Sequence, residues 1–327
     1  MKAIVQDRYG PPDVLRLDEV DRPVPRGNQV LVRVHAAAVN ALDWHFMRGD
    51  PYLARIGLGF SGPRTKIRGV DFAGTVEATG PDATRFRPGE EVYGEAFGAF
   101  ADYVCAPENV LDTKPANLTF PEAAAVPLAG NTALIGLRDL AELQPGQRVL
   151  INGASGGVGT FAVQIAKAYG AEVTAVCSHR NVELVESLGA DRIIDYLRED
   201  FTRSAPPHDV VFDLVGNRSL TDLRRVLTPR GTLLLSGGGT SNGGSLVGPM
   251  GLGFKGKLLS SFVKQRVHVL FAKQATENLA ALRELIESGK VRPVIDRSYP
   301  LREVPAAIRY LEDEHARAKV VIVVTES

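Results

Sequence analysis

The chain has 327 residues, of which 44% are hydrophobic and 23% are charged, with 38 Lys and Arg residues against 38 Asp and Glu. This length suggests about two domains, and the composition is ordinary for a soluble globular protein. Because the net charge is close to zero, no overall field attracts nucleic acid or an anionic membrane. The two cysteines exclude a disulfide framework and a four-cysteine zinc site.

Residues 1 to about 120 have the pattern of short β-strands. The first residues, MKAIV, predict a strand rather than a signal peptide. In residues 30–35 three valines alternate with Leu, Arg and His, which is the period of a strand with one buried face. Turn sequences such as RPGE recur between such stretches, so we expect a barrel or a sandwich. The apolar run 320–324 is too short to cross a bilayer, and we expect a cytoplasmic protein without nucleic-acid or membrane partners.

From about residue 121 the pattern changes to alternating strands and helices. Pro121 opens a helical stretch rich in Ala and Leu. The strands that we then expect are 148–154, 171–177, 192–196, 209–215, 231–236 and 266–272, and the helices between them are 157–170, 181–190 and 219–227. This alternation predicts a doubly wound parallel sheet with helices on both faces. The tail predicts a helix at 274–288, a strand at 294–299, a helix at 303–313 and a strand at 319–324, returning to the first domain.

The stretch INGASGGVGT, residues 151–160, fits two motifs. Residues 153–157 fit G-x-S-x-G, which presents a serine nucleophile, and residues 154–159 fit a glycine-rich dinucleotide turn with Ala in the first Gly place. A predicted strand precedes the turn and a helix follows it, as pyrophosphate binding at a helix N-terminus requires. A hydrolase would need an HGGG-like oxyanion loop upstream, and no such stretch precedes residue 150. We therefore expect Ser155 to offer a hydroxyl or N–H group to a phosphate.

The residues after the second strand of this series bear on the choice of coenzyme. An NAD site usually places an acid there, on the ribose 2′-hydroxyl. This chain has Ser178 and Arg180 instead, which can donate to a 2′-phosphate. We therefore predict NADPH over NADH, the alternative being that Arg180 is a solvated charge at a helix start. The segment 236–253, with eight glycines in 18 residues, follows another strand and is either a loop over the ligand or a plain surface loop.

Several blocks resemble a known family almost from end to end: KIRGVDFAGTVEATG, RPGEEVYG, LINGASGGVGTFAVQIAKAYGAEVTAV, LGADRIIDY and AKVVIVV. They are similar to the zinc-independent branch of the medium-chain dehydrogenase/reductases, and specifically to quinone oxidoreductases, the zeta-crystallin-like proteins. The resemblance implies an α/β fold with a GroES-like β-rich domain, residues 1–121 plus 272–327, and a Rossmann domain, residues 122–271. The active site would be the cleft between them.

The resemblance also implies a set of coenzyme-binding positions, which besides Ser155 are Asn40, Thr132, Gly156, Gly157, Val158, Ser178, Arg180, Tyr196, Val215, Ser236, Phe271 and Lys319. Tyr196 would complete the 2′-phosphate pocket, although an ordinary tyrosine at a strand end is the alternative. Lys319 would meet the adenosine phosphate. Asn40 and Thr132 would lie beside the nicotinamide and its ribose.

We expect no metal ion, because the positions that bind zinc in relatives carry no Cys or His-Glu pair, and Asp43 and His45 lack a third ligand. Without a Lewis acid, hydride from NADPH would go to a quinone or an α,β-unsaturated carbonyl compound, whose negative charge is delocalised. Tyr52 is the candidate proton donor, with packing or a water proton as alternatives. A carbonyl reductase of the same fold and a nucleotide-binding protein with little turnover are the rival functions. A homodimer could pair the strand at 267–271.

Overall fold

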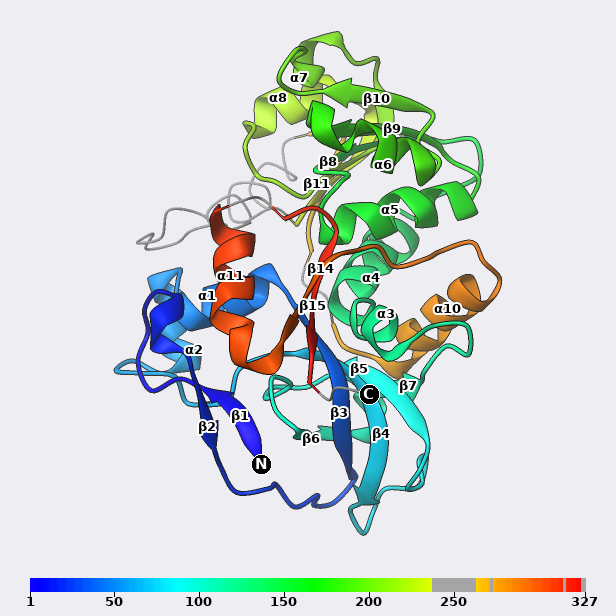
Figure 1. Ribbon diagram of the computed structural model, residues 1–327. Coiled ribbons are helices and arrows are strands. Elements are labelled where there is room, and N and C mark those ends of the chain that lie inside the picture. The colour runs from blue at the N-terminus through cyan, green and yellow to red at the C-terminus, as the bar shows by residue number, and fades with distance from the viewer. Residues whose placement is uncertain (237–262, 271–272, 314–315, 325–327) are drawn as a thin grey trace.

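The computed structural model describes residues 1–236, 263–270, 273–313 and 316–324. Figure 1 shows two lobes, with the sheet of the central chain segment above and the sheet of both chain ends below. Among the described residues, no helix is both long and apolar enough to span a membrane.

The lower lobe is built on a mainly antiparallel sheet with the strand order β14-β15-β3-β4-β5-β7, and β6 also pairs with β3. Its strands are β3 (Gln29–Val39), β4 (Asp71–Thr79), β5 (Glu91–Glu95), β6 (Tyr103–Pro107), β7 (Leu111–Thr113), β14 (Ile295–Pro300) and β15 (Lys319–Val323). β1 (Lys2–Val5) and β2 (Arg16–Glu19) form a separate ribbon. The strand pattern predicted for the first third is confirmed, because the valines of β3 are buried and Arg33 is exposed.

Two short helices interrupt the β-rich part, and the strand-like pattern did not predict them. They are α1 (Ala41–Arg48) and α2 (Arg55–Leu58), with a 3₁₀ turn at Tyr52–Ala54 between them. α1 begins after Asn40, whose backbone N–H donates to the Asp43 carboxylate at 2.8 Å, and ends at Gly49 in the left-handed conformation. α1 follows directly after β3, at the end of that strand that faces the upper lobe (Figure 1).

The upper lobe is the predicted parallel sheet, with the order β10-β9-β8-β11-β12-β13 among the described strands. The strands are β8 (Arg148–Asn152), β9 (Glu172–Cys177), β10 (Arg192–Asp195), β11 (His208–Asp213), β12 (Leu227–Leu235) and β13 (Arg266–Val269). The order reverses between β8 and β11, and open parallel sheets bind ligands at such a switch point. The predicted strand at 266–272 is confirmed for the residues of β13.

Helices cover both faces of this parallel sheet, as predicted. α5 (Gly157–Ala168) and α6 (Val182–Ser187) pack with Val149 and Ile151 of β8, whereas α7 (Phe201–Ser204) and α8 (Leu220–Arg225) pack with the oppositely directed Leu150. α3 (Phe120–Ala124), α4 (Pro127–Leu134) and a π-helical turn (Ile135–Leu140) lead into β8. α3 and α4 lie between the two sheets in Figure 1, and one buried cluster runs from β3 and β4 through them to β8 and α5.

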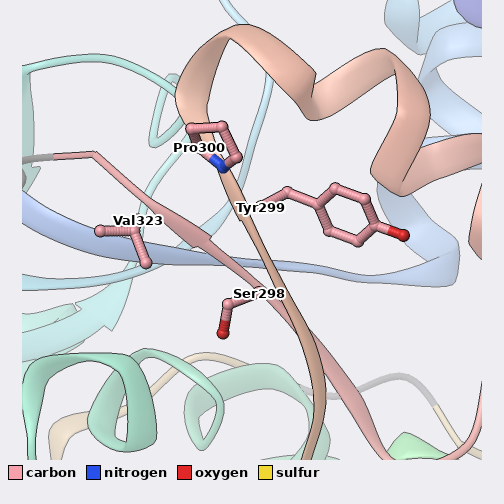
Figure 2. A pocket seen from close by; sticks show the side chains of 4 residues that line it. All are labelled: Ser298, Tyr299, Pro300 and Val323. Carbon is pink, nitrogen blue, oxygen red and sulfur yellow. The ribbon is translucent and has the colours of Figure 1, made fainter.

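The chain end returns to the first lobe, as predicted. After α10 (Thr276–Glu287), β14 and α11 (Val304–Asp313), strand β15 pairs antiparallel with β3. A cavity of about 250 Å³ lies along β14 and β15, lined by Ser298, Tyr299, Pro300 and Val323 (Figure 2). These residues stand at the end of both strands opposite to Lys319, and they include no charged side chain.

Candidate functional site

The glycine-rich turn has the shape that a pyrophosphate cradle needs. Gly153 has φ +89°, and a Cβ atom at Gly159 would lie 2.2 Å from the carbonyl oxygen of Gly153, so both positions require glycine. A Cβ atom at Gly156 would have the Gly153 oxygen as its nearest neighbour, at 3.4 Å. As far as the described residues go, the outer side of Gly156 is therefore open to a ligand. α5 begins at Gly157, so the unpaired N–H groups of its first turn point to the same place.

The C-terminal segment docks directly onto this turn. The backbone N–H of Ala318 donates to the carbonyl oxygen of Ser155 at 2.7 Å, and Gly156 and Ala318 form an isolated parallel bridge. A Cβ atom at Gly157 would lie 3.2 Å from Cδ of Lys319, so the lysine stem passes under the start of α5. The turn of one lobe is thereby fixed against the last strand of the other.

Lys319 ends in a buried polar network at the edge of the lower sheet. Its side chain is 2% exposed, and its ammonium donates to Oδ1 of Asn40 and lies 3.5 Å from Asp71, which is fully buried. Asn40 donates to Asp71 at 3.0 Å, and the backbone N–H of Leu128 donates to the other carboxylate oxygen at 3.2 Å. Burial raises the pKa of Asp71 while the Lys319 charge and these donors oppose the rise. The four groups come from β15, the end of β3, β4 and α4.

Two more carboxyl groups stand at this edge of the sheet. Glu95, at the end of β5, is paired in register with Asp71 and accepts a hydrogen bond from Gln274 at 3.1 Å. Burial, with the charge of Asp71 adding to it, raises the pKa of Glu95 to about 8. Burial also raises the pKa of Asp43 to about 7. Of these three carboxyl groups, Asp71 lies against the Lys319 ammonium group, and a pKa of about 8 means that Glu95 is mostly protonated at neutral pH.

The residues predicted for the 2′-phosphate pocket follow the ends of two paired strands. Asp195 of β10 lies opposite Cys177 of β9, and the N–H of Tyr196 donates to the carbonyl oxygen of Cys177 at 3.2 Å. Ser178 therefore starts beside Tyr196, whose side chain is 45% exposed, and Arg180 follows on an exposed turn. No acid occupies positions 178–181, directly after β9.

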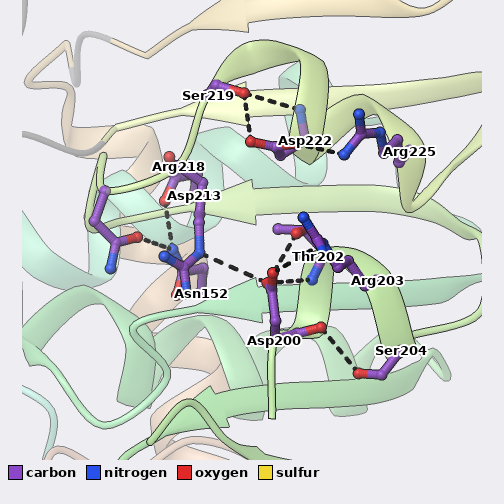
Figure 3. Close-up of polar contacts among 11 residues, drawn as sticks. Asn152, Asp200, Thr202, Arg203, Ser204, Asp213, Arg218, Ser219, Asp222 and Arg225 are labelled. Atoms are coloured by element: carbon purple, nitrogen blue, oxygen red, sulfur yellow. Dashed lines mark hydrogen bonds and ion pairs between the residues drawn. The ribbon is translucent and has the colours of Figure 1, made fainter.

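The ends of β8 and β11 bring further predicted residues to the turn. Asp213 of β11 accepts from the Asn152 amide at 2.8 Å (Figure 3). It also accepts from the N–H groups of Val215 and Gly216. These bonds fold the chain so that a Cβ atom at Gly153 would lie 2.8 Å from Cγ2 of Val215. The N–H of Ser236, after β12, donates to the Asp213 carbonyl oxygen at 3.0 Å.

The remaining predicted residues differ in their placement. Thr132 is buried on α4, and its hydroxyl donates to the carbonyl oxygen of Leu128 at 2.7 Å. Leu128 is also the residue whose N–H donates to Asp71. Val158 lies in the first turn of α5. Tyr52 is 45% exposed, and the Arg55 guanidinium lies over its ring, 4.7 Å from the ring centroid. Phe271 and the glycine-rich loop positions 237–253 lie outside the described residues.

Sequence reasoning missed three of the polar groups at this site, namely Asp71, Glu95 and Asn181. Asp71 is the first residue of β4, Glu95 is the last residue of β5, and Asn181 lies four residues after β9, so each stands near one terminus of a strand, where polar residues can face a ligand. That position is a signal that could have singled them out. Their burial and their partners come from the packing of the two lobes.

A GroES-like domain joined to a Rossmann domain, with a glycine-rich turn at the switch point, defines a class of nicotinamide-dependent oxidoreductases. Family models match in both parts of the chain: "Alcohol dehydrogenase GroES-like domain" over residues 26–116 and "Zinc-binding dehydrogenase" over residues 188–322. The word zinc belongs to the description of that family. Among the described residues, no group of three or more His, Cys, Asp or Glu side chains is placed to hold a metal ion.

Individual relatives cover nearly the whole chain. Human "NAD(P)H oxidoreductase RTN4IP1, mitochondrial" is 36% identical over 98% of this chain and 89% of the relative. "NADPH-dependent alkenal/one oxidoreductase, chloroplastic" of Arabidopsis thaliana is 34% identical over 98% of this chain and 79% of the relative. The solved quinone oxidoreductase of Coxiella burnetii has a TM-score of 0.86 at 33% identity, covering 99% of both chains. The chain belongs to the quinone oxidoreductase family of the medium-chain dehydrogenase/reductases, and it is an NAD(P)H-dependent oxidoreductase.

Proposed function

We propose that this protein uses NADPH to reduce a quinone or an α,β-unsaturated carbonyl compound, without zinc. The observation that carries the choice of NADPH is the set of side chains at the ends of β9 and β10. Ser178 and Tyr196 directly follow these paired strands, Arg180 is two residues after Ser178, and no acid occupies positions 178–181, where an NAD-specific site usually has one. A guanidinium group binds the 2′-phosphate through charge-assisted hydrogen bonds and gains nothing comparable from a 2′-hydroxyl.

The residues present fit a bound dinucleotide. The open side of Gly156 would admit the pyrophosphate, and the N–H groups at the start of α5 would donate to it. Thr132 uses its proton on Leu128, so its oxygen still accepts, as a carboxamide of the coenzyme requires. Asn40 is held by Lys319 and Asp71 and cannot change its rotamer freely. When bound, the reduced nicotinamide supplies the hydride, and these side chains orient it.

The acceptor class rests on the relatives and on the chemistry of the site. One relative is named for alkenals and enones, and one solved structure is that of a quinone oxidoreductase. Both kinds of acceptor spread the negative charge that hydride transfer creates over a conjugated system. We propose that Tyr52, on the 3₁₀ turn that follows α1, gives the proton that completes the reduction.

Spectrophotometric oxidation of NADPH tests this function, with quinones, enones, aldehydes and simple ketones as acceptors and NADH in parallel. Turnover of quinones or enones and a preference for NADPH are expected. Arg180→Ala should raise the Kd for NADPH by about 10- to 100-fold and leave the Kd for NADH nearly unchanged. Arg203→Ala removes a guanidinium that is 79% exposed on α7 and serves as the matched control. Equal losses for both coenzymes would refute the assignment of Arg180, and a preference for simple ketones would favour the carbonyl reductase.

We propose a cytoplasmic location and a homodimer as secondary features. β13 ends the strand order of the upper sheet among the described residues, so its outer edge can pair with a second copy. Light scattering on the purified protein tests the dimer: the mass of a single chain, 35.2 kDa, would refute it.

A further inference from the structure

Asn181 links the two phosphate-binding parts of the upper lobe. Its side chain is 4% exposed, and its amide nitrogen donates to Oγ of Ser155 at 2.9 Å and to Oγ of Ser178 at 3.3 Å. Ser155 belongs to the glycine-rich turn after β8, and Ser178 directly follows β9. One buried amide thus contacts a hydroxyl at the expected pyrophosphate site and a hydroxyl at the expected 2′-phosphate site.

The direction of these bonds decides what the hydroxyls can do. A serine hydroxyl has one proton to donate and lone pairs that accept. When Asn181 donates into a lone pair of each oxygen, each hydroxyl proton is left to point away from the amide. Both serines are partly exposed, so an acceptor from solution can reach them. A fully ionised phosphate group carries no proton, so its oxygens accept hydrogen bonds and donate none. Such oxygens match hydroxyls arranged in this way.

The oxygen of the Asn181 amide shows that this arrangement lowers the stability of the folded state. Oδ1 of Asn181 is buried and has no hydrogen-bond partner among the described residues. A buried polar atom without a partner destabilises the folded state. An apolar side chain of similar size would avoid that cost, so the two bonds to the serines are the contribution that distinguishes asparagine here.

We propose that Asn181 is a positioning residue for the coenzyme, which turns the hydroxyl protons of Ser155 and Ser178 toward the phosphates of the bound nucleotide. This inference rests on the proposed function and adds a residue that acts through two others. In this role Asn181 acts through the hydroxyls of Ser155 and Ser178, to which its amide donates. It raises affinity by removing the freedom of two hydroxyl groups before binding, and it joins the pyrophosphate and 2′-phosphate sites into one unit.

Calorimetric titration of NADPH in two backgrounds tests this role. Asn181→Leu keeps the approximate volume and removes the donor. In the otherwise unchanged protein it should weaken NADPH binding about tenfold, with turnover at saturating NADPH within about twofold of the unchanged protein. In a Ser155→Ala/Ser178→Ala background the same substitution should change the Kd by less than about twofold, because the hydroxyls through which it acts are gone.

Asn278→Leu is the matched control, because Asn278 is an amide of similar burial, 8% exposed, on α10 and bonded to Arg138. It should leave the Kd for NADPH unchanged. The same loss from Asn181→Leu in both backgrounds would show a merely structural role and overturn the inference, as would unchanged or tighter binding in the single variant. Circular dichroism and thermal melting of each variant identify a folding failure, in which case Asn181→Ala takes its place in the same two backgrounds. If the unchanged protein bound no reduced nicotinamide coenzyme, the proposed function would fall together with this inference.

Discussion

The buried ion pair of Lys319 and Asp71 lies where the two lobes meet, and it allows the sharpest prediction about the stability of the protein. Lys319→Met removes the ammonium group and keeps most of the stem that passes under Gly157. Asp71→Asn removes the partner charge and keeps the shape of the side chain. Each single substitution leaves the other group in a site that is 2% exposed or less.

The expected magnitude follows from the distance and the burial of the pair. Unit charges 3.5 Å apart attract each other by about 5 kcal/mol at an effective dielectric constant of about 20. Burial of both ions offsets much of this attraction, so the pair as a whole adds little stability. Breaking one side leaves an uncompensated charge, and Lys319→Met should lower the free energy of unfolding by about 3 kcal/mol. Asp71→Asn should cost a similar amount.

Urea unfolding of the two single variants and the double variant measures the coupling at neutral pH. The double variant should be more stable than the sum of the single losses predicts, by at least about 1.5 kcal/mol. Val323→Ala, at the other end of β15, serves as a packing control that should show no coupling with Asp71→Asn. Additive losses for Lys319→Met and Asp71→Asn would refute the view that these two groups act as one buried pair.

Three further predictions concern the same site. Burial raises the pKa of Glu95 to about 8, whereas an unfolded Glu titrates at about 4.3. Between these two pH values the folded chain keeps a proton that the unfolded chain has lost. The free energy of unfolding should therefore fall as the pH rises across this range. Glu95→Gln should remove up to about 1.4 kcal/mol per pH unit of that slope in urea unfolding, and an unchanged slope would contradict the assignment. Tyr52→Phe should lower turnover with enones about 10- to 100-fold, and unchanged turnover would remove Tyr52 from the mechanism. Gly159→Ala should destabilise the fold by about 1–3 kcal/mol, because the added Cβ would collide with the carbonyl oxygen of Gly153. Gly57→Ala is the control and should not destabilise the fold, because no described atom lies within 4 Å of the added Cβ. Equal melting temperatures for the two variants would contradict the geometry of the turn.

The sequence was sufficient to predict the parts of the fold that depend on local pattern. The βα series from β8 to β12 follows from runs of apolar residues and glycine turns, and a parallel sheet brings the carboxyl ends of its strands to one edge. The positions of Ser155, Ser178 and Tyr196 follow from that rule. α1 was missed because its eight residues stand between strands and carry a weak helical pattern.

The polar network could not be predicted, because its members are far apart along the chain. Lys319 and Asp71 are 248 residues apart, and Gln274 and Glu95 are 179 apart. Pairing of this kind depends on how the last strand returns to the first sheet, and no local pattern encodes the partner. The sequence singled out Lys319 as a coenzyme residue, and that role stays a prediction. The structure adds that its ammonium group is already held by Asn40 and Asp71.

The most direct test of the account is calorimetric titration of NADPH into the protein and into Gly156→Ala. Gly156 has φ −80°, and among the described residues an added Cβ would meet only the Gly153 oxygen, at 3.4 Å, so the variant should fold and melt like the unchanged protein. The added methyl group would occupy the space in which we propose that the pyrophosphate binds. The account predicts clear binding to the unchanged protein and a loss of at least about tenfold in Gly156→Ala. Equal affinity in both proteins, or no binding to the unchanged one, would contradict it.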